Sequence, residues 1–486
     1  MTRPIGIHPG NKKIFEYKGR PVVLFCATEH YGAVMNRPFD FEAYLDYCGA
    51  NGQNYTRLFL LFRELQTPMN PYSTCKPEST DYISPYVRTG PGPAADGLQK
   101  YNLDIWNDEY FERLHRFMAC AEKNDVVVEA TLFSNEYTND LFSLIPFHPG
   151  ANVNNLGDID FAEWMSRKNE SIFRYQKKFV SKIVAELNRY PNLFYEVCNE
   201  PVCFKPGLAS AGDINAWQQE LIDYIRVQEK ELPNKHMVAV TECWTFDESG
   251  RLSVNTDLSF SSLAADIANV HPLPDVMYGG KAYDLGLFMS RQLKLGQLRD
   301  YCMDTYKEQR PLNMDEDNIA SRFMDEEAWT IHRKRAWTTI FCGAHYDYID
   351  FSIINRLPTG TAESGMYLHR WFRILREYIK KMDFVNGRPL KDIVMDLPCE
   401  VLESVFGNPD GDIFIYLADK RELAQESAGN PVDGSLDLNL GQGEYAVEFY
   451  SPESGMVIGE SHTNGGHAVI GLPRFREDIA IRLSKI

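Results

Sequence analysis

Long apolar runs are missing from this 486-residue sequence, and no hydrophobic stretch is long enough to cross a bilayer. The residues after Met1 do not form an apolar leader, so we expect a cytoplasmic protein. Basic residues are also scarce, because 50 Lys and Arg stand against 68 Asp and Glu, giving a formal charge of −18. Nucleic acids and anionic membranes bind basic surfaces, so we expect neither as a partner.

Paired metal-ligand spacings are absent as well. The ten cysteines are scattered, several of them inside apolar runs where a free thiol behaves as a small hydrophobe. No two histidines have the close spacing of a catalytic zinc site. A metal-dependent hydrolase remains a minor alternative, and it would have to use the scattered set His30, His271, His345 and Asp350. We therefore expect no metal and no organic cofactor.

The Gly-rich phosphate turn of a dinucleotide-binding fold does not follow the first expected strand. Buried strands instead alternate with amphipathic helices, a pattern that predicts a parallel sheet. Eight such units favour closure into a (β/α)8 TIM barrel. The expected strands are 22–28, 55–60, 126–133, 193–197, 236–240, 267–270, 311–314 and 346–351, and the expected helices are 41–48, 109–123, 169–187, 214–229, 287–306, 326–340 and 368–381.

The two ends of the chain do not follow this alternation of strands and helices. A hairpin turning at Lys18-Gly19 precedes the first barrel strand and should close the barrel floor. After about Asn386 helical periodicity stops, and short alternating runs lie between strong turns, which predicts a small all-β sandwich. The expected domains are a catalytic barrel over 1–385 and an accessory sandwich over 386–486. Two strand-poor stretches, 66–102 and 145–167, are expected to be long loops at the C-terminal face of the barrel.

Two carboxyl groups at strand ends suggest a chemistry. Hydrolysis of a glycosidic bond needs one carboxyl on each side of the anomeric carbon, and in a barrel these come from the C-terminal ends of different strands. Asn199-Glu200-Pro201 directly follows the fourth expected strand, with a proline that restricts the turn and an amide that can bind a sugar hydroxyl. For this tripeptide alone, an ordinary polar turn is the alternative.

The second carboxyl belongs to Asp315-Glu316-Asp317, at the end of the seventh expected strand. Because side chains alternate along a strand, we expect Glu316 to face the barrel axis while Asp315 and Asp317 point away. An acidic turn or a divalent-ion site is the alternative. Arg57 in the second strand and His271 after the sixth could donate hydrogen bonds to the Glu316 carboxylate and hold it ionised.

As a set, these positions resemble the retaining glycoside hydrolases of the cellulase and mannanase kind, glycoside hydrolase family five and its clan relatives. Such enzymes place Arg on strand two, Asn-Glu-Pro on strand four, His on strand six and a nucleophilic Glu on strand seven. The same order is found here as Arg57, Asn199, Glu200, His271 and Glu316, and the resemblance spans roughly Val22 to Lys381. It implies that Glu200 is the acid/base and Glu316 the nucleophile of a retaining mechanism, with an oligosaccharide or glycoside as substrate.

The sequence also departs from that family. Leu273 stands where a Tyr is common, and the eighth strand lacks the usual Trp, so Tyr283 or Tyr348 would have to supply the missing hydroxyl. Further candidates for substrate binding follow other strands: His30, Tyr31, Trp164 and Trp244. A carbohydrate-binding barrel without catalysis and an inverting glycosidase are the alternatives. The linkage, the sugar and the oligomeric state stay open.

Overall fold

The chain folds around eight parallel strands, seen here in a computed structural model that describes residues 3–29, 32–61 and 80–486. Their order in the sheet is β4-β17-β16-β13-β10-β9-β8-β5, so strands that follow one another in the chain lie side by side. The predicted TIM barrel is therefore confirmed. The strands are β4 (Phe25–Thr28), β5 (Tyr55–Phe59), β8 (Val127–Ser134), β9 (Leu193–Asn199), β10 (Val238–Thr241), β13 (Ile267–Val270), β16 (Leu312–Asp317) and β17 (His345–Ile349).

The barrel closes between β4 and β5 through side-chain amides. Asn54 donates from Nδ2 to the carbonyl of Val23 (2.8 Å), and its Oδ1 accepts from the backbone N–H of Phe25 (3.2 Å). Gln53 accepts from the N–H of Ala27 at 3.0 Å. These contacts satisfy backbone groups that a strand ladder would otherwise pair, because a buried N–H or C=O left without a partner is costly.

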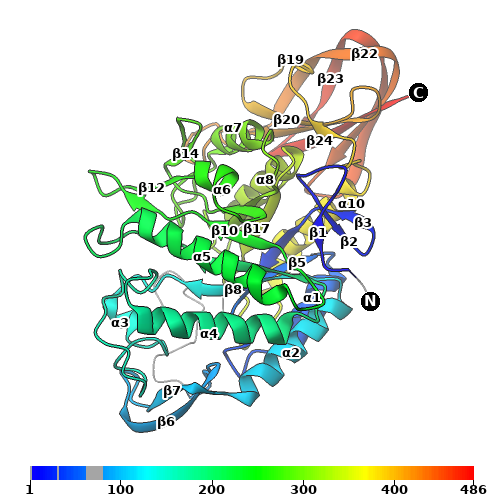
Figure 1. The fold of residues 1–486 in the computed structure, drawn as a ribbon. Coiled ribbons are helices and arrows are strands. Elements are labelled where there is room, and N and C mark those ends of the chain that lie inside the picture. Colours follow the sequence, from blue (N-terminus) through cyan, green and yellow to red (C-terminus); the bar gives the residue numbers. More distant parts are fainter. Residues whose placement is uncertain (1–2, 30–31, 62–79) are drawn as a thin grey trace.

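Helices cover the outside of the barrel (Figure 1), and side-chain caps fix where several of them begin. Asn169, Ser210 and Asp325 cap α4, α5 and α8, and Ser210 forms a capping box with Asp213. The helices are α1 (Phe41–Ala50), α2 (Asp108–Lys123), α3 (Asn139–Phe142), α4 (Glu170–Leu187), α5 (Ala211–Glu229), α6 (Asp257–Ser261), α7 (Leu295–Thr305), α8 (Glu326–Phe341), α9 (Ala362–Ser364), the π-helical turn η1 (Gly365–His369) and α10 (Arg370–Ile379). None of the helices in the described ranges is long and apolar enough to cross a membrane.

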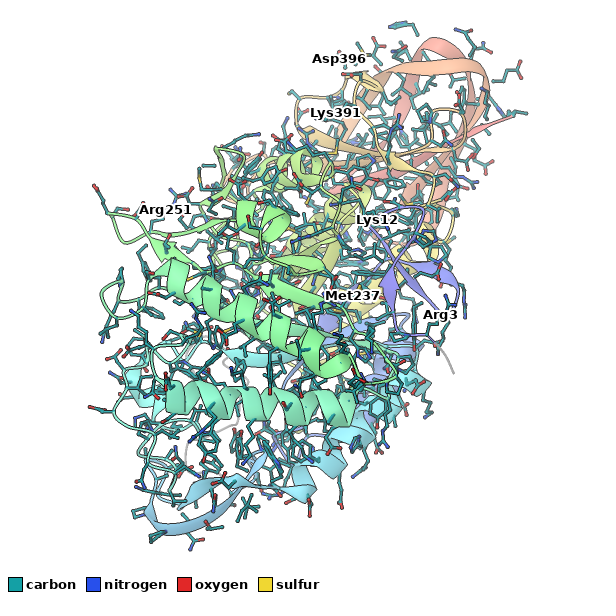
Figure 2. The ribbon with its side chains drawn as sticks, viewed as in Figure 1. Arg3, Lys12, Met237, Arg251, Lys391 and Asp396 are labelled. Atoms are coloured by element: carbon teal, nitrogen blue, oxygen red, sulfur yellow. The ribbon has the colours of Figure 1, made fainter. Side chains whose placement is uncertain are left out.

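The predicted hairpin at the barrel floor is present. Strands β1 (Gly6–Ile7), β2 (Phe15–Tyr17) and β3 (Arg20–Val22) form a small antiparallel sheet. Phe15 stacks on Phe194 with 6.3 Å between ring centroids, and its centroid lies 4.6 Å from that of His345. Met237 packs in the same hydrophobic cluster. In Figure 2 it lies toward the end of the barrel that this small sheet covers, whereas Arg251 lies toward the opposite end.

Three local expectations differ from the structure. Helix α7 begins at Leu295 instead of residue 287, because Met289, Arg291 and Lys294 all have positive φ and cannot continue a helix. Part of the expected loop 66–102 is a hairpin of β6 (Tyr86–Pro93) and β7 (Gln99–Trp106), whose Gly- and Pro-rich sequence hid it. A small sheet of β11 (Thr245–Phe246), β12 (Leu252–Asn255), β14 (Val276–Tyr278) and β15 (Lys281–Tyr283) was also not predicted.

The predicted all-β domain follows the barrel and is confirmed. Its strands form a single hydrogen-bonded antiparallel sheet: β18 (Arg388–Pro389), β19 (Val394–Asp396), β20 (Val401–Gly407), β21 (Ile413–Asp419), β22 (Val432–Ser451), β23 (Met456–Phe475) and β24 (Asp478–Lys485). One face of this sheet packs on α8, where Trp337 stacks on Tyr416 with centroids 5.3 Å apart. The domain thus covers one flank of the barrel (Figure 1). The nine cysteines that the structure describes are free thiols.

Candidate active site

Glu200 and Glu316 lie at the C-terminal ends of their strands, where a barrel places catalytic groups. Both are largely buried, with 8% and 4% of their surfaces exposed. One carboxylate oxygen of each, together with a ring nitrogen of His271, lies within 4.8 Å of the others. Both glutamates also have a positive φ, 45° for Glu200 and 49° for Glu316. Such backbone is uncommon for residues other than glycine and is concentrated at functional sites.

The positive φ of Glu316 coincides with a break in strand β16. Its pairing with β17 shifts register between Met314 and Asp317, as in a β-bulge. As a result Asp315 and Glu316 both reach the barrel interior, and the Asp315 carboxylate lies 3.3 Å from Arg57. The expectation that Asp315 points away from the axis is therefore wrong, because strict alternation requires a regular strand. Asp317 does point away, and it pairs with Arg335 of α8 at 2.5 Å.

Arg57 extends from β5 into the middle of the barrel, where it is 1% exposed. One guanidinium nitrogen donates to Glu316 Oε2 at 2.5 Å. Another donates to Glu196 Oε2 at 2.6 Å and to Asn199 Oδ1 at 3.1 Å. The structure thus brings three of the predicted site residues, Arg57, Asn199 and Glu316, into one hydrogen-bonded cluster.

His271, after β13, contacts both glutamates but unequally. Its Nδ1 lies 3.1 Å from Glu200 Oε1 and 4.0 Å from Glu316 Oε2, so its hydrogen bond goes to Glu200. Its Nε2 lies 3.2 Å from Asp315 Oδ2. Burial lowers the pKa of His271, but the hydrogen bonds to Asp315 and Glu200 and the charge of Glu316 outweigh it and raise that pKa to about 10.

Tyr137 is a site residue that the sequence did not reveal. It follows β8 with a φ of 43°, and its hydroxyl donates to Glu200 Oε2. Neither tyrosine suggested by the sequence fills this place. The Tyr283 hydroxyl donates to Asp304 of α7 at 2.6 Å, and the Tyr348 ring lies 4.2 Å from His332 of α8. A polar residue directly after a strand end was the available signal, and the run Asn135-Glu136-Tyr137 does follow β8.

Of the two tryptophans predicted to bind substrate, one lies beside the site and the other lies in the core. Trp244 lies next to the site, with its ring 5.6 Å from His271, and its backbone pairs with Pro201 and Cys203 beside Glu200. Its side chain is only 2% exposed. Trp164 is fully buried and stacks on Phe142, so it packs in the core beneath the loops. His30 and Tyr31 lie outside the described residues.

The electrostatics of the two glutamates are governed by burial and by their neighbours. Burial raises the pKa of Glu316 to about 8, although Arg57 and His271 act to lower it, and the charges of Glu200 and Asp315 add to the rise. When two carboxyl groups lie this close, their protons belong to the pair rather than to one residue. A pair that retains one proton near neutral pH has what acid and base catalysis requires.

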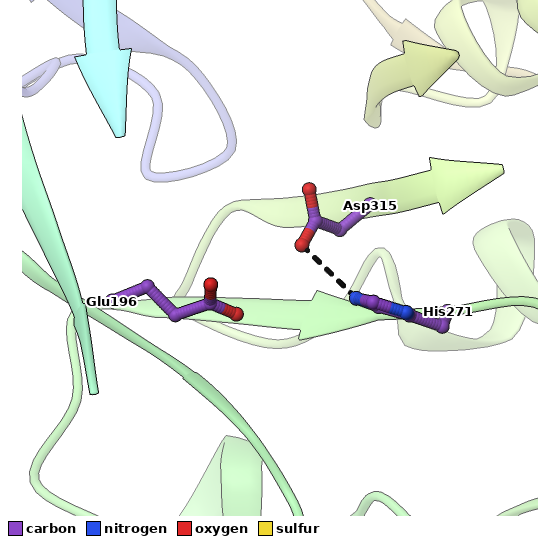
Figure 3. Close-up of side chains that lie close together, drawn as sticks. All are labelled: Glu196, His271 and Asp315. Carbon is purple, nitrogen blue, oxygen red and sulfur yellow. Dashed lines mark hydrogen bonds and ion pairs between the residues drawn. The ribbon is translucent and has the colours of Figure 1, made fainter. Parts of the chain in front are cut away.

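Two groups of side chains at the site have the donor types that could hold a cation. One is Glu200, His271 and Glu316, and the other is Glu196, His271 and Asp315, drawn in Figure 3. In the second group Arg57 already lies 2.6 Å from Glu196 and 3.3 Å from Asp315. The guanidinium therefore supplies the positive charge at that place. Another histidine of the metal alternative, His345, lies at the barrel floor, where it contacts Lys13 and Leu24.

Part of the sequence of this chain matches a known protein family, and its fold is similar to those of known proteins. Residues 86–271 match the family model for cellulase, glycosyl hydrolase family 5. No curated protein matches the chain in sequence. Among solved structures, a glycoside hydrolase family 5 protein from Bacteroides vulgatus is similar, with 11% identity, a TM-score of 0.62, and coverage of 99% of this chain and 93% of that one.

Two endo-β-1,4-mannanases are also similar in structure. The enzyme from Rhizomucor miehei has 13% identity and a TM-score of 0.51 over 77% of this chain and 99% of its own. The enzyme from Thermotoga petrophila has 15% identity and a TM-score of 0.51 over 95% and 98%. At these identities the structures support the fold, whereas the family model matches sequence that ends at His271, in the candidate site. The chain is accordingly a glycoside hydrolase that resembles glycosyl hydrolase family 5.

Proposed function

We propose that the chain is a retaining glycosidase that cleaves a β-glycosidic bond, with Glu316 as nucleophile and Glu200 as acid/base. The observation that carries the proposal is the short separation of the two glutamates, one oxygen of each lying within 4.8 Å. Retaining enzymes hold their carboxyl groups about 5–5.5 Å apart, whereas inverting enzymes need about 6.5–9.5 Å to admit a water molecule. A separation this short favours the retaining class.

In the first step, Glu316 Oε attacks the anomeric carbon and forms a glycosyl ester while the glycosidic C–O bond breaks. Glu200 transfers its proton to the leaving oxygen. In the second step, Glu200 takes a proton from water, and the water oxygen displaces Glu316 from the sugar. Arg57, at 2.5 Å from Glu316, supports the carboxylate when it leaves.

An oligosaccharide or glycoside is the substrate of such an activity, and β-mannosides are the first class to test. Two of the similar structures bear the name endo-β-1,4-mannanase, and the matching family model is that of the cellulases. We therefore place aryl β-mannosides and β-glucosides, with the matching β-1,4-linked oligosaccharides, first in a substrate panel.

Azide rescue is the decisive experiment. The wild type, Glu200→Ala and Glu316→Ala are assayed on the aryl glycoside panel with and without sodium azide, and the products are identified by NMR. We expect Glu316→Ala to give a glycosyl azide of inverted configuration and Glu200→Ala one of retained configuration. Each substitution should reduce kcat by roughly 10³-fold or more without azide, since it removes a group used in the transition state.

Glu242→Gln is the matched control. Glu242 is another buried carboxyl at the end of a barrel strand, and burial raises its pKa to about 7. Its carboxylate, however, accepts a hydrogen bond from the hydroxyl of Ser259 rather than from a residue of the glutamate pair's site. This variant should retain activity. Full activity of Glu200→Ala or Glu316→Ala would refute that residue's role. Inversion by the wild type would place the enzyme in the inverting class, and binding without cleavage across the panel would favour a carbohydrate-binding barrel.

A further inference from the structure

We propose that Asp315 is a positioning residue that keeps both ring nitrogens of His271 protonated and directs Nδ1–H at Glu200. The inference rests on the proposed function for its catalytic meaning, because Glu200 is the acid/base there. The arrangement itself, however, is a property of the folded chain. It can be measured without any substrate.

The geometry of the imidazole carries the proposal. Its Nδ1 lies 3.1 Å from Glu200 Oε1, and its Nε2 lies 3.2 Å from Asp315 Oδ2. Figure 3 shows the second contact, with the Asp315 carboxylate reaching the edge of the ring. A neutral imidazole has one N–H and one lone pair, and an ionised carboxylate only accepts hydrogen bonds. An ionised Asp315 can therefore be satisfied only if Nε2 carries hydrogen, and Glu200, once it has given up its proton, only if Nδ1 carries hydrogen as well.

Asp315 is held in place by donors other than His271. It is completely buried, and Asn269 donates to its Oδ2 and Asn313 to its Oδ1, each at 3.3 Å. Arg57 lies 3.3 Å from the same Oδ2. Contacts of this kind fix the orientation of the carboxylate. Asp315 is thus a rigid acceptor, whereas Glu200 must gain and lose a proton during the reaction.

The charges around His271 come from several elements. Glu200 and Glu316, from the ends of β9 and β16, lie 3.1 and 4.0 Å from Nδ1, Asp315 of β16 lies 3.2 Å from Nε2, and Glu196 of β9 has a carboxylate oxygen within 4.8 Å of the ring. Arg57 of β5 is the cation next to this group, and the Trp244 ring covers the imidazole edge-on. Four acidic side chains near one imidazole favour its cationic form, in agreement with the raised pKa described above.

The catalytic consequence concerns Glu200 after it has given up its proton. A fixed Nδ1–H donates to the new carboxylate and holds it in position until water arrives. In Asp315→Asn, the imidazole would lose one of its charged partners, and its cationic form would give up a proton at lower pH. If its Nε2–H then still pointed at the asparagine oxygen, Nδ1 would present a lone pair to the Glu200 carboxylate.

The first test is an NMR titration of protein labelled with ¹⁵N in its histidines. The His271 signals are assigned by their loss in His271→Asn, and the wild type, Asp315→Asn and Asp347→Asn are titrated from pH 5 to 9. We expect the wild-type His271 to show both nitrogens protonated up to at least pH 8 and Asp315→Asn to lose that proton at least one pH unit lower. Asp347 is the matched control, because it is equally buried on the next strand but bonds Cys26 and Thr28.

A neutral His271 in the wild type at pH 7 would overturn the proposal, and this outcome does not depend on whether any variant folds. An unchanged titration in a folded Asp315→Asn, checked by circular dichroism, would also overturn it. Neither result needs activity, so the proposal can fail while the glycosidase function stands. If no sugar is cleaved, the proposed function fails while the titration still decides the state of His271.

The second test uses a substrate found in the panel. Asp315→Asn should lower kcat by about tenfold or more while KM changes less than about threefold, because the loss affects a proton-transfer group rather than sugar binding. The limbs of the pH profile of kcat/KM should also move, because Asp315→Asn removes a negative charge that raises the pKa of Glu316 and, in doing so, weakens the hold of His271 on its proton. Asp347→Asn should leave both limbs within about 0.3 units. A loss of kcat with unmoved limbs would mean that Asp315 is only structural.

Discussion

At the scale of single residues, Glu200 is held by one donor at each carboxylate oxygen. His271 donates to Oε1, and the Tyr137 hydroxyl donates to Oε2. The two donors differ, because a hydroxyl can also rotate and accept a hydrogen bond from a protonated carboxyl. Tyr137 can therefore stay bound to Oε2 whether or not that oxygen carries the proton, whereas a cationic imidazole can only donate.

Replacing Tyr137 by phenylalanine should reduce kcat by about 10- to 100-fold, the equivalent of losing a hydrogen bond to a charged group of about 1.5–3 kcal/mol. KM should change less, because the ring and the packing are retained. Steady-state kinetics on the best substrate of the panel measure the effect. Tyr283→Phe is the control, since its hydroxyl bonds Asp304, and a loss in that variant of the same size would argue against a specific role for Tyr137.

Two buried histidines away from the site should control how the protein responds to acid. Burial lowers the pKa of His345 and of His332 to about 3, from an ordinary value of 6.5. Between pH 3 and pH 6.5, the unfolded chain therefore binds a proton at each of these histidines, whereas the folded chain does not. The free energy of unfolding should therefore fall as the pH drops from about 6.5 toward 3, by up to about 1.4 kcal/mol per pH unit for each group.

Urea unfolding at pH 7.5 and pH 5.0 checks this prediction. His345→Gln should show a smaller difference between the two pH values than the wild type, because one of the two groups no longer titrates. His8→Gln serves as control, as His8 is not one of the fully buried histidines. An identical pH dependence in His345→Gln and the wild type would contradict the assignment.

At the scale of elements, strand β16 is the part of the barrel on which the site depends most. Its register shift lets Asp315 and Glu316 face the interior together, while Asp317 pairs with the fully buried Arg335. The Arg335 guanidinium also donates to the carbonyl of Leu293. This ion pair fixes the residue that follows Glu316, and so it holds the irregular end of the strand in place.

Asp317→Ala should lower the free energy of unfolding by about 3–5 kcal/mol, because it leaves the Arg335 charge buried without its partner. Chemical denaturation measures the loss. The exposed pair of Lys281 and Asp304 provides the contrast, and Lys281→Ala should cost less than about 1 kcal/mol. Similar costs for the two variants would mean that burial does not set the strength of the Asp317 pair.

The sequence predicted the regular elements and missed the irregular ones. All eight barrel strands lie within a few residues of their expected places, because each is a short apolar run between polar turns. The bulge in β16 could not be read, since alternation assumes a regular strand. The hairpin of β6 and β7 was hidden because its Gly90-Pro91-Gly92-Pro93 run is typical of loops.

The same limit applies to the site. Glu200 and Glu316 could be proposed because strand ends are visible in a sequence and barrels use them. The contacts of His271 could not be assigned, because its choice of Glu200 over Glu316 depends on differences of about an ångström. Tyr137 was missed because its position depends on a loop with left-handed backbone, and no periodic pattern describes such a loop.

At the scale of the whole molecule, the barrel and the β-domain share one hydrophobic core. On the barrel side Trp337, Phe341 and Tyr378 pack against Tyr416 and Tyr450 of the sheet. Arg333 of α8 adds a buried ion pair with Asp478 of β24 at 2.9 Å. A large apolar interface of this kind makes separate motion of two domains unfavourable. The boundary between residues 385 and 386 stays a prediction.

Calorimetry should therefore show a single unfolding transition for the whole chain. Tyr416→Ala should lower its stability by about 3–5 kcal/mol, as expected for removing a buried aromatic side chain, and should shift the transition without splitting it. Phe246→Ala, at a residue that is 43% exposed, should change the transition little. Two separate transitions in the wild type would contradict the shared core.

The place of β24 in the sheet has a consequence for how the protein is made. This strand lies between β21 and β22, although it is synthesised after both of them. During translation those two strands emerge with unpaired backbone edges, and α8 emerges with Arg333 lacking its partner Asp478. The β-domain can therefore pack on the barrel in its final form only after residue 485 has been synthesised. Until then, the unpaired strand edges of the nascent chain are exposed to aggregation.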